Sequence, residues 1–69
     1  MQDHVYKLSE IVGTSPKSIN DAIEGALARA RKSIRNIRWF EVGNIRGNID
    51  PDGTTHYQVM LKIGFTLED

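Results

Sequence analysis

The sequence predicts an α+β domain in which a three-stranded antiparallel sheet curls around one helix, in the order strand, helix, strand, strand. One stretch repeats apolar residues every three or four positions, which is typical of an amphipathic helix. The last segment alternates apolar and polar side chains, which is typical of a strand with one buried face. The tetrapeptide Asp50-Pro51-Asp52-Gly53 carries proline and glycine where a type I turn favours them, so its flanking segments are predicted to form a hairpin.

The first two predicted elements lie in the N-terminal half of the chain. The segment His4–Val12 is rich in β-branched and aromatic residues, and we predict a strand that Gly13 ends. A helix is predicted over Pro16–Ile37, because proline suits the first helical position and Ser15 can serve as the N-cap. Acidic residues fall in the early turns and basic residues in the late ones, which complements the helix dipole.

Two more strands are predicted after the helix, over Trp39–Ile49 and Thr54–Leu67. The second alternates cleanly, with its apolar face toward the helix. The apolar residues of the first change phase between Val42 and Ile45, and a bulge near Gly43-Asn44 would account for this change. The helix returns the chain to the start of the first strand, so the last strand can lie antiparallel between the other two.

The length of 69 residues predicts a single domain over residues 1–69. A core in a chain of this size rarely supplies more than about 3–5 kcal/mol without a disulfide, a metal or a neighbouring subunit. The chain has no cysteine, and its two histidines are far apart in sequence. We therefore expect oligomerisation to supply the missing stability.

Charge and hydropathy narrow the classes of partner. Nine basic residues balance nine acidic ones, whereas a protein that neutralises a phosphate backbone is usually strongly basic, so we expect no nucleic-acid partner. No apolar run approaches the roughly 20 residues that cross a bilayer. The N-terminus also lacks the basic segment followed by an apolar segment that is typical of a signal peptide. We expect a soluble, cytoplasmic protein without a membrane partner.

Catalytic motifs are scarce in this sequence. It contains no nucleophile elbow, no P-loop and no histidine–glutamate metal motif. Glu41 could act as a lone acid or base, but a single carboxylate on a strand usually faces solvent. We therefore predict a protein that is not an enzyme and has no catalytic residues or metal site.

Trp39 is the most informative side chain for function. Neighbouring side chains of a strand point to opposite faces of the sheet. If Phe40 faces the helix, Trp39 therefore lies on the opposite face, together with Gln58. The tryptophan there is either an interface contact or a platform on which a planar ligand stacks. Counting back from the turn places Gln58 opposite the neighbourhood of Ile45 and Arg46 and Trp39 opposite Gly64, so that Gln58 and Trp39 lie about 20 Å apart. The two can share a small ligand only if different subunits supply them.

Four short motifs, I-V-G-T-S, W-F-E-V, I-R-G and Y-Q-V, occur at specific separations along the chain, together with their flanking stretches. Through these motifs the chain resembles the bacterial dodecins over nearly its whole length. The resemblance implies a β-α-β-β fold, assembly as a hollow homododecamer, and flavin binding at a two-fold interface. It further implies storage of free FMN or riboflavin, or of FAD, with quenching of the excited state.

The resemblance also implies roles for particular residues. Trp39 would stack on the flavin, and Gln58 would hydrogen-bond the polar edge of the isoalloxazine ring. Arg46 would lie at the pocket and favour the phosphate of FMN, although a surface or intersubunit ion pair, for example with Glu41, is the alternative for it. Glu41 and Gly47, which lie in the matched motifs, complete the predicted flavin-binding set.

Two positions depart from the pattern of the bacterial dodecins. Arg38 stands where they commonly have aspartate, which adds positive charge beside the pocket. Thr66 stands where they commonly have arginine, so coenzyme A, which some members bind at a subunit contact, is the less secure ligand. The alternatives to flavin storage are a flavin-dependent redox enzyme and a structural assembly module without a ligand.

Overall fold

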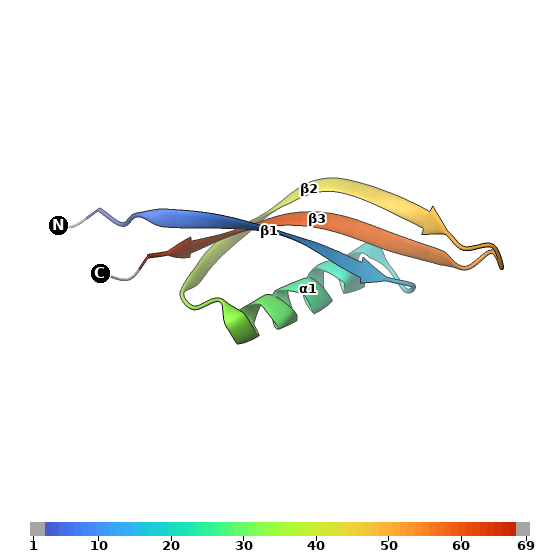
Figure 1. Cartoon of the computed structure of the whole chain (residues 1–69), viewed down its shortest axis with the longest axis horizontal. Coiled ribbons are helices and arrows are strands. Elements are labelled where there is room, and N and C mark those ends of the chain that lie inside the picture. The colour runs from blue at the N-terminus through green and yellow to red at the C-terminus, as the bar shows by residue number, and fades with distance from the viewer. Residues whose placement is uncertain (1–2, 68–69) are drawn as a thin grey trace.

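A computed structural model describes residues 3–67 of the chain. It consists of the strand β1 (Tyr6–Ser15), the helix α1 (Ile19–Ser33) and the strands β2 (Ile37–Ile49) and β3 (Thr55–Thr66). The strand order is β1-β3-β2, and both neighbouring pairs are antiparallel. Helix α1 packs on one side of this sheet (Figure 1). The predicted β-α-β-β fold with a three-stranded antiparallel sheet is therefore confirmed.

The prediction that Gly13 ends the first strand is wrong. β1 runs on to Ser15, and Gly13 pairs with Val59 inside the ladder. A methyl group at Gly13 would overlap the carbonyl oxygen of Ala22 and lie 2.8 Å from Cβ of Ala26. Glycine is required here because α1 crosses the strand at this point with no room for a side chain.

The predicted start of the helix is also wrong. α1 begins at Ile19 rather than at Pro16, and Ser18 is the N-cap, its side chain accepting a hydrogen bond of 2.9 Å from the backbone N–H of Asp21. Ser15 is buried and donates to the carboxylate of Asp21 at 2.7 Å, while accepting from backbone N–H groups of the turn at 2.9 and 3.4 Å. Ser15 thus holds the turn before the helix instead of capping it.

The helix ends at Ser33, well before the predicted end at Ile37. Ile34 has extended backbone angles, and Asn36 takes a left-handed φ of 63° that turns the chain into β2. Ile34 and Ile37 still pack against the core. Their positions therefore continue the apolar spacing of the helix beyond its end. For this reason the spacing predicted a helix that was too long.

The predicted turn at the tip of the hairpin is confirmed. The N–H of Gly53 donates to the carbonyl of Asp50 at 2.9 Å, and the N–H of Asp50 donates to the carbonyl of Thr54 at 2.8 Å. The side chain of Asp52 accepts from the backbone N–H of Thr54 at 2.9 Å, and this hydrogen bond lowers the pKa of the Asp52 carboxyl. Gly53 has a φ of 92°, a conformation that favours glycine.

β2 carries two irregularities in its pairing with β3. The first is the predicted bulge, since the register shifts between Val42 and Ile45. The second, which was not predicted, lies between Ile37 and Trp39 and leaves Arg38 as the extra residue. Each bulge changes the direction in which the following side chains point. The bulge at Arg38 puts Ile37 and Trp39 on opposite faces of the sheet.

The core is small and lies under α1. Its buried members are alanines of the helix and aliphatic residues of β3 (Ala22, Ala26, Ala30, Val59, Leu61 and Ile63). The helix packs on β1 and β3, so Phe40 and Val42, although on the helix side of β2, stay 45% and 40% exposed. Ile45 and Ile49 continue this apolar row along β2.

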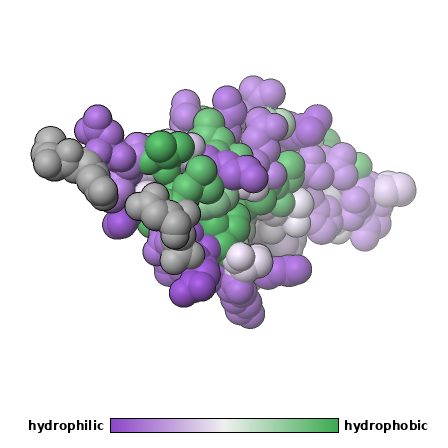
Figure 2. Space-filling view, turned by 60° about the vertical axis from the view of Figure 1, so that its left-hand side comes forward, coloured by the Kyte–Doolittle hydropathy of each residue, from purple (hydrophilic) through white to green (hydrophobic). Residues whose placement is uncertain are grey.

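The chain is elongated, with extents of 55 × 21 × 15 Å and a radius of gyration of 14.5 Å. A compact domain of this length would have a radius near 11 Å. Figure 2 shows a group of apolar side chains at the surface, bordered by polar ones. No helix within residues 3–67 is long and apolar enough to span a bilayer. Shape and exposed apolar surface together favour an assembly of several copies.

Candidate functional site

The face of the sheet opposite α1, called the outer face below, holds the predicted site residues except Gly47. Residues paired across an antiparallel ladder point to the same side, and Ile63 and Leu61, which are buried under α1, define the helix side. The alternate positions then belong to the outer face. Its members include Tyr6, Leu8, Trp39, Glu41, Arg46, Gln58, Met60, Lys62, Gly64 and Thr66.

Trp39 lies on the outer face as predicted, directly across from Gly64. A methyl group built on Gly64 would overlap the benzo ring of the indole, so the ring rests on the strand backbone itself. The ring of Tyr6 meets it edge-on, with centroids 5.0 Å apart and an interplanar angle of 71°. Trp39 nevertheless stays 39% exposed. This supported and accessible indole has the geometry of a stacking platform.

Tyr6 and Gly64 were not among the predicted site residues. The predicted hairpin register already placed Gly64 opposite Trp39, but it did not show that the indole rests on the glycine. The position of Tyr6 depends on the register between β1 and β3, which was not predicted. Gly64 is the supporting residue of the platform, and Tyr6 borders it.

We expect Gly64→Ala to displace the indole of Trp39, because the added methyl group and the ring cannot occupy the same space. The indole is partly exposed and can rotate away, so the loss of stability should stay within about 1–3 kcal/mol. Tryptophan fluorescence should shift, and any ligand that stacks on Trp39 should bind about tenfold more weakly. Unchanged tryptophan emission and ligand affinity in this variant would contradict the supporting role of Gly64.

The remaining predicted residues lie toward the hairpin. Arg46 pairs with Gln58, and Gly47 pairs with Tyr57, which places Gly47 on the helix side of the sheet. The pairing of Gln58 with Arg46 confirms the predicted register. Gln58 lies six positions before Gly64, the partner of Trp39, along β3, which corresponds to about 20 Å. Within one chain, the structure does not bring Trp39 together with Gln58 and Arg46.

Glu41 is exposed on the outer face, opposite Lys62. Arg46 and Glu41 do not form an ion pair within the chain. In the part that the structure describes, the one ion pair joins His56 and Asp50 at 2.9 Å. Across the described ranges no three histidine or acidic side chains gather as a metal site would need.

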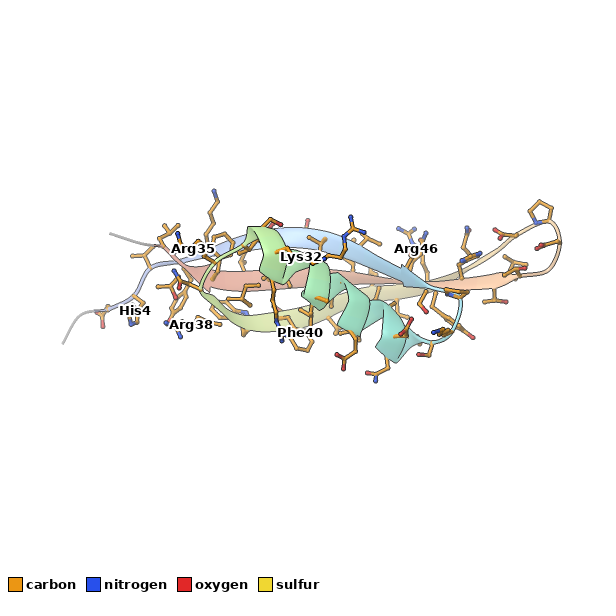
Figure 3. The ribbon with its side chains drawn as sticks, turned by 90° about the horizontal axis from the view of Figure 1, so that it is seen from below. His4, Lys32, Arg35, Arg38, Phe40 and Arg46 are labelled. Carbon is orange, nitrogen blue, oxygen red and sulfur yellow. The ribbon has the colours of Figure 1, made fainter. Side chains whose placement is uncertain are left out.

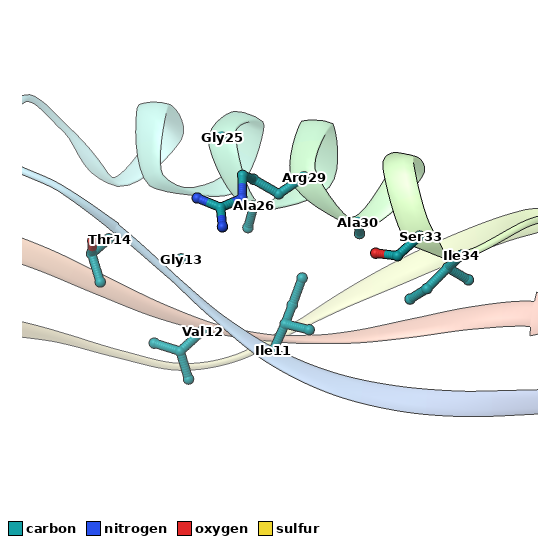
Figure 4. Close-up of a pocket in the computed structure, with 10 residues that line it drawn as sticks. All are labelled: Ile11, Val12, Gly13, Thr14, Gly25, Ala26, Arg29, Ala30, Ser33 and Ile34. Atoms are coloured by element: carbon teal, nitrogen blue, oxygen red, sulfur yellow. The ribbon is translucent and has the colours of Figure 1, made fainter.

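A groove of about 580 Å³ lies on the other side of the molecule, between α1 and β1 (Figure 4). Its lining includes Gly13, Gly25 and Arg29, and none of the predicted flavin-binding residues. The predicted site is therefore an open surface of the sheet in a single chain. It can enclose a ligand only when a second surface covers it.

A sequence profile of the Dodecin family matches residues 5–68. The chain belongs to the dodecin family. A curated dodecin from Thermus thermophilus is 54% identical over 65 residues, with 94% of each chain covered. A second curated relative, named calcium dodecin, from Mycobacterium tuberculosis, is 36% identical over 63 residues, covering 91% of this chain and 89% of that protein.

Solved dodecin structures have the same fold. A crystal structure from T. thermophilus superposes with a TM-score of 0.88 at 52% identity, covering 97% of this chain and 98% of the other. The dodecin of Streptomyces coelicolor superposes with a TM-score of 0.90 at 43% identity, covering 100% of this chain and 99% of the other. The family predicted from the motifs is therefore confirmed.

Proposed function

We propose that this chain forms a homododecameric shell that binds flavin, holds it in store and quenches its excited state. The observation that carries the proposal is the indole of Trp39, supported by Gly64 and left 39% exposed on the sheet face opposite the core. An isoalloxazine ring is planar and apolar over its faces, so it would stack on this platform. An electron-rich indole against the ring also offers a route for fast non-radiative decay.

Assembly is a condition of this proposal. Trp39 stands about 20 Å from Gln58 and Arg46 in one chain, so a ring stacked on Trp39 would reach Gln58 of a second subunit. Exposed apolar residues on both faces of the sheet, such as Leu8 at 53% and Ile45 at 49%, supply the surface that subunits would bury. The shell would thus stabilise the small core and complete the ligand site with the same contacts.

The other predicted residues would act at the polar parts of the flavin. In this proposal Gln58 hydrogen-bonds the ring edge and Arg46 meets the phosphate of FMN. Glu41 would border the ring in the assembly, whereas Gly47, which faces the helix side of the sheet, would take part only through its backbone. FMN, FAD and riboflavin are the proposed ligands. Coenzyme A is left out, because Thr66 stands where the resemblance implies a basic residue.

We propose binding and storage rather than turnover. A flavin held against Trp39 and covered by a second subunit would leave little room for a substrate. Steady oxidation of NAD(P)H by the flavin-loaded protein would instead support the alternative of a redox enzyme.

A fluorescence-quenching titration tests the proposal. FMN, FAD, riboflavin and lumichrome are each titrated with the purified protein, and the particle mass is measured in the same buffer by light scattering. We expect strong quenching by a particle of dodecamer size. Lack of quenching with all four ligands on an assembled particle would overturn flavin binding and favour the structural module.

A further inference from the structure

Arg38 occupies an unusual place on the outer face. It is the extra residue of the second bulge, since Ile37 pairs with Phe65 and Trp39 with Gly64. Two residues of a bulged strand oppose one residue of the partner, so Arg38 departs from the strict alternation of the strand. Its Nε donates a hydrogen bond of 3.0 Å to Oγ1 of Thr66. This contact holds the guanidinium group of Arg38 on the outer face.

The hydrogen bond also places the charge beside the indole. Thr66 follows Gly64 by two positions on β3, so the two residues are neighbours on the outer face, and Thr66 pairs with Tyr6. The ring of Tyr6 in turn contacts Trp39 at 5.0 Å. Arg38 and Trp39 therefore border the same patch of surface, and the positions across the sheet from them are uncharged.

The other cations of the outer face are placed differently. Arg46 lies toward the hairpin, whereas Arg38 lies at the end that carries the termini (Figure 3). Lys62 stands between Glu10 and Glu41, its partners on the two neighbouring strands. A carboxylate on each neighbouring strand thus offsets the positive charge of Lys62. Within one chain, Arg38 is therefore the cation that lies next to the platform without a carboxylate directly across the ladder.

We propose that Arg38 adds a second cation to this site, beside Arg46 of the partner subunit, and strengthens its preference for phosphorylated flavins by binding the phosphate of the ligand that stacks on Trp39. The inference rests on the proposed flavin binding and adds to it the selection of phosphorylated flavins over neutral riboflavin. Stacking on the indole would serve all flavins alike, because they share the isoalloxazine ring. Only FMN and FAD carry an anionic group on the ribityl chain. A guanidinium group whose Nε is held by Thr66 keeps its terminal N–H groups as donors for phosphate oxygens.

The test compares the ratio of the riboflavin and FMN dissociation constants in three variants of the assembled protein. Arg38→Gln removes the charge beside Trp39. Lys32→Gln removes an equal charge from the exposed surface of α1 and serves as the matched control. The double exchange of Arg38→Thr with Thr66→Arg returns a guanidinium group to the same patch from β3. Quenching titrations with each flavin supply the constants, and light scattering confirms that each variant assembles.

We expect Arg38→Gln to lower the ratio by about three- to tenfold, mainly through weaker FMN binding. Riboflavin affinity should change by less than about twofold. Lys32→Gln should leave the ratio unchanged, and the exchange should restore most of it. The preference of the wild-type protein for FMN should also weaken as salt is raised.

An unchanged ratio in Arg38→Gln, with quenching intact, would overturn the role of Arg38 and leave flavin binding standing. Equal losses in Arg38→Gln and Lys32→Gln would overturn it as well, because the effect would then come from net charge. If the wild-type protein quenches neither flavin, the proposed function fails and this inference fails with it.

Discussion

Trp39→Ala is expected to weaken flavin binding by about fivefold to 150-fold and to restore the fluorescence of the flavin. Loss of an aromatic stacking partner typically costs about 1–3 kcal/mol, which corresponds to that range. The indole is partly exposed and outside the core, so its removal should leave the fold of the chain intact. Quenching titrations with riboflavin and FMN, alongside circular dichroism, measure both effects.

Trp39→Phe is the matched control for that experiment. Phenylalanine keeps an aromatic ring above Gly64 but lacks the larger, more electron-rich indole, so we expect intermediate affinity and weaker quenching. If alanine and wild-type proteins bind flavin equally, Trp39 serves subunit packing alone. That result would favour the alternative prediction from the sequence, in which Trp39 is an interface contact.

Gly13→Ala is expected to destabilise the chain strongly. The new methyl group would overlap the carbonyl oxygen of Ala22 and press on Cβ of Ala26, and neither neighbour is the flexible end of a long side chain. Overpacking of this kind costs about 1–3 kcal/mol or more, since β1 and α1 must separate. Urea unfolding at one fixed protein concentration measures the loss, because assembly makes stability depend on concentration.

Gly25→Ala is the control for this second prediction. Gly25 lies in α1 with nothing within 4 Å of an added Cβ. The same substitution there should be neutral or stabilise the chain by up to about 1 kcal/mol, because alanine is the better helix former. Equal destabilisation at both positions would contradict the close approach of α1 to Gly13.

The hairpin was predictable in detail because its signals are local. The turn at Asp50–Gly53 and the alternation of β3 set the register, and the register places Trp39 opposite Gly64 and Gln58 opposite Arg46. The phase change after Val42 also predicted its bulge. These features depend on residues close together in sequence, so periodicity and turn chemistry suffice for them.

The ends of β1 and α1 were not predictable in the same way. Gly13 looked like the end of a strand, but the approach of α1 requires it inside the ladder. Ser15 looked like a helix cap, but Asp21 and the turn engage it. Ile37 looked helical, because an isoleucine that packs on the core from a strand satisfies the same period.

By itself the sequence determined the fold class, the family and the outer-face position of Trp39. Tertiary structure alone showed that Gly64 supports the indole, that Tyr6 borders it, and that the second bulge brings Arg38 to Thr66. The alternation of apolar and polar residues along a strand predicts on which face of the sheet each side chain lies. Contacts between β1, β2 and β3 depend on the register among distant segments, and packing settles that register only when the whole sheet forms.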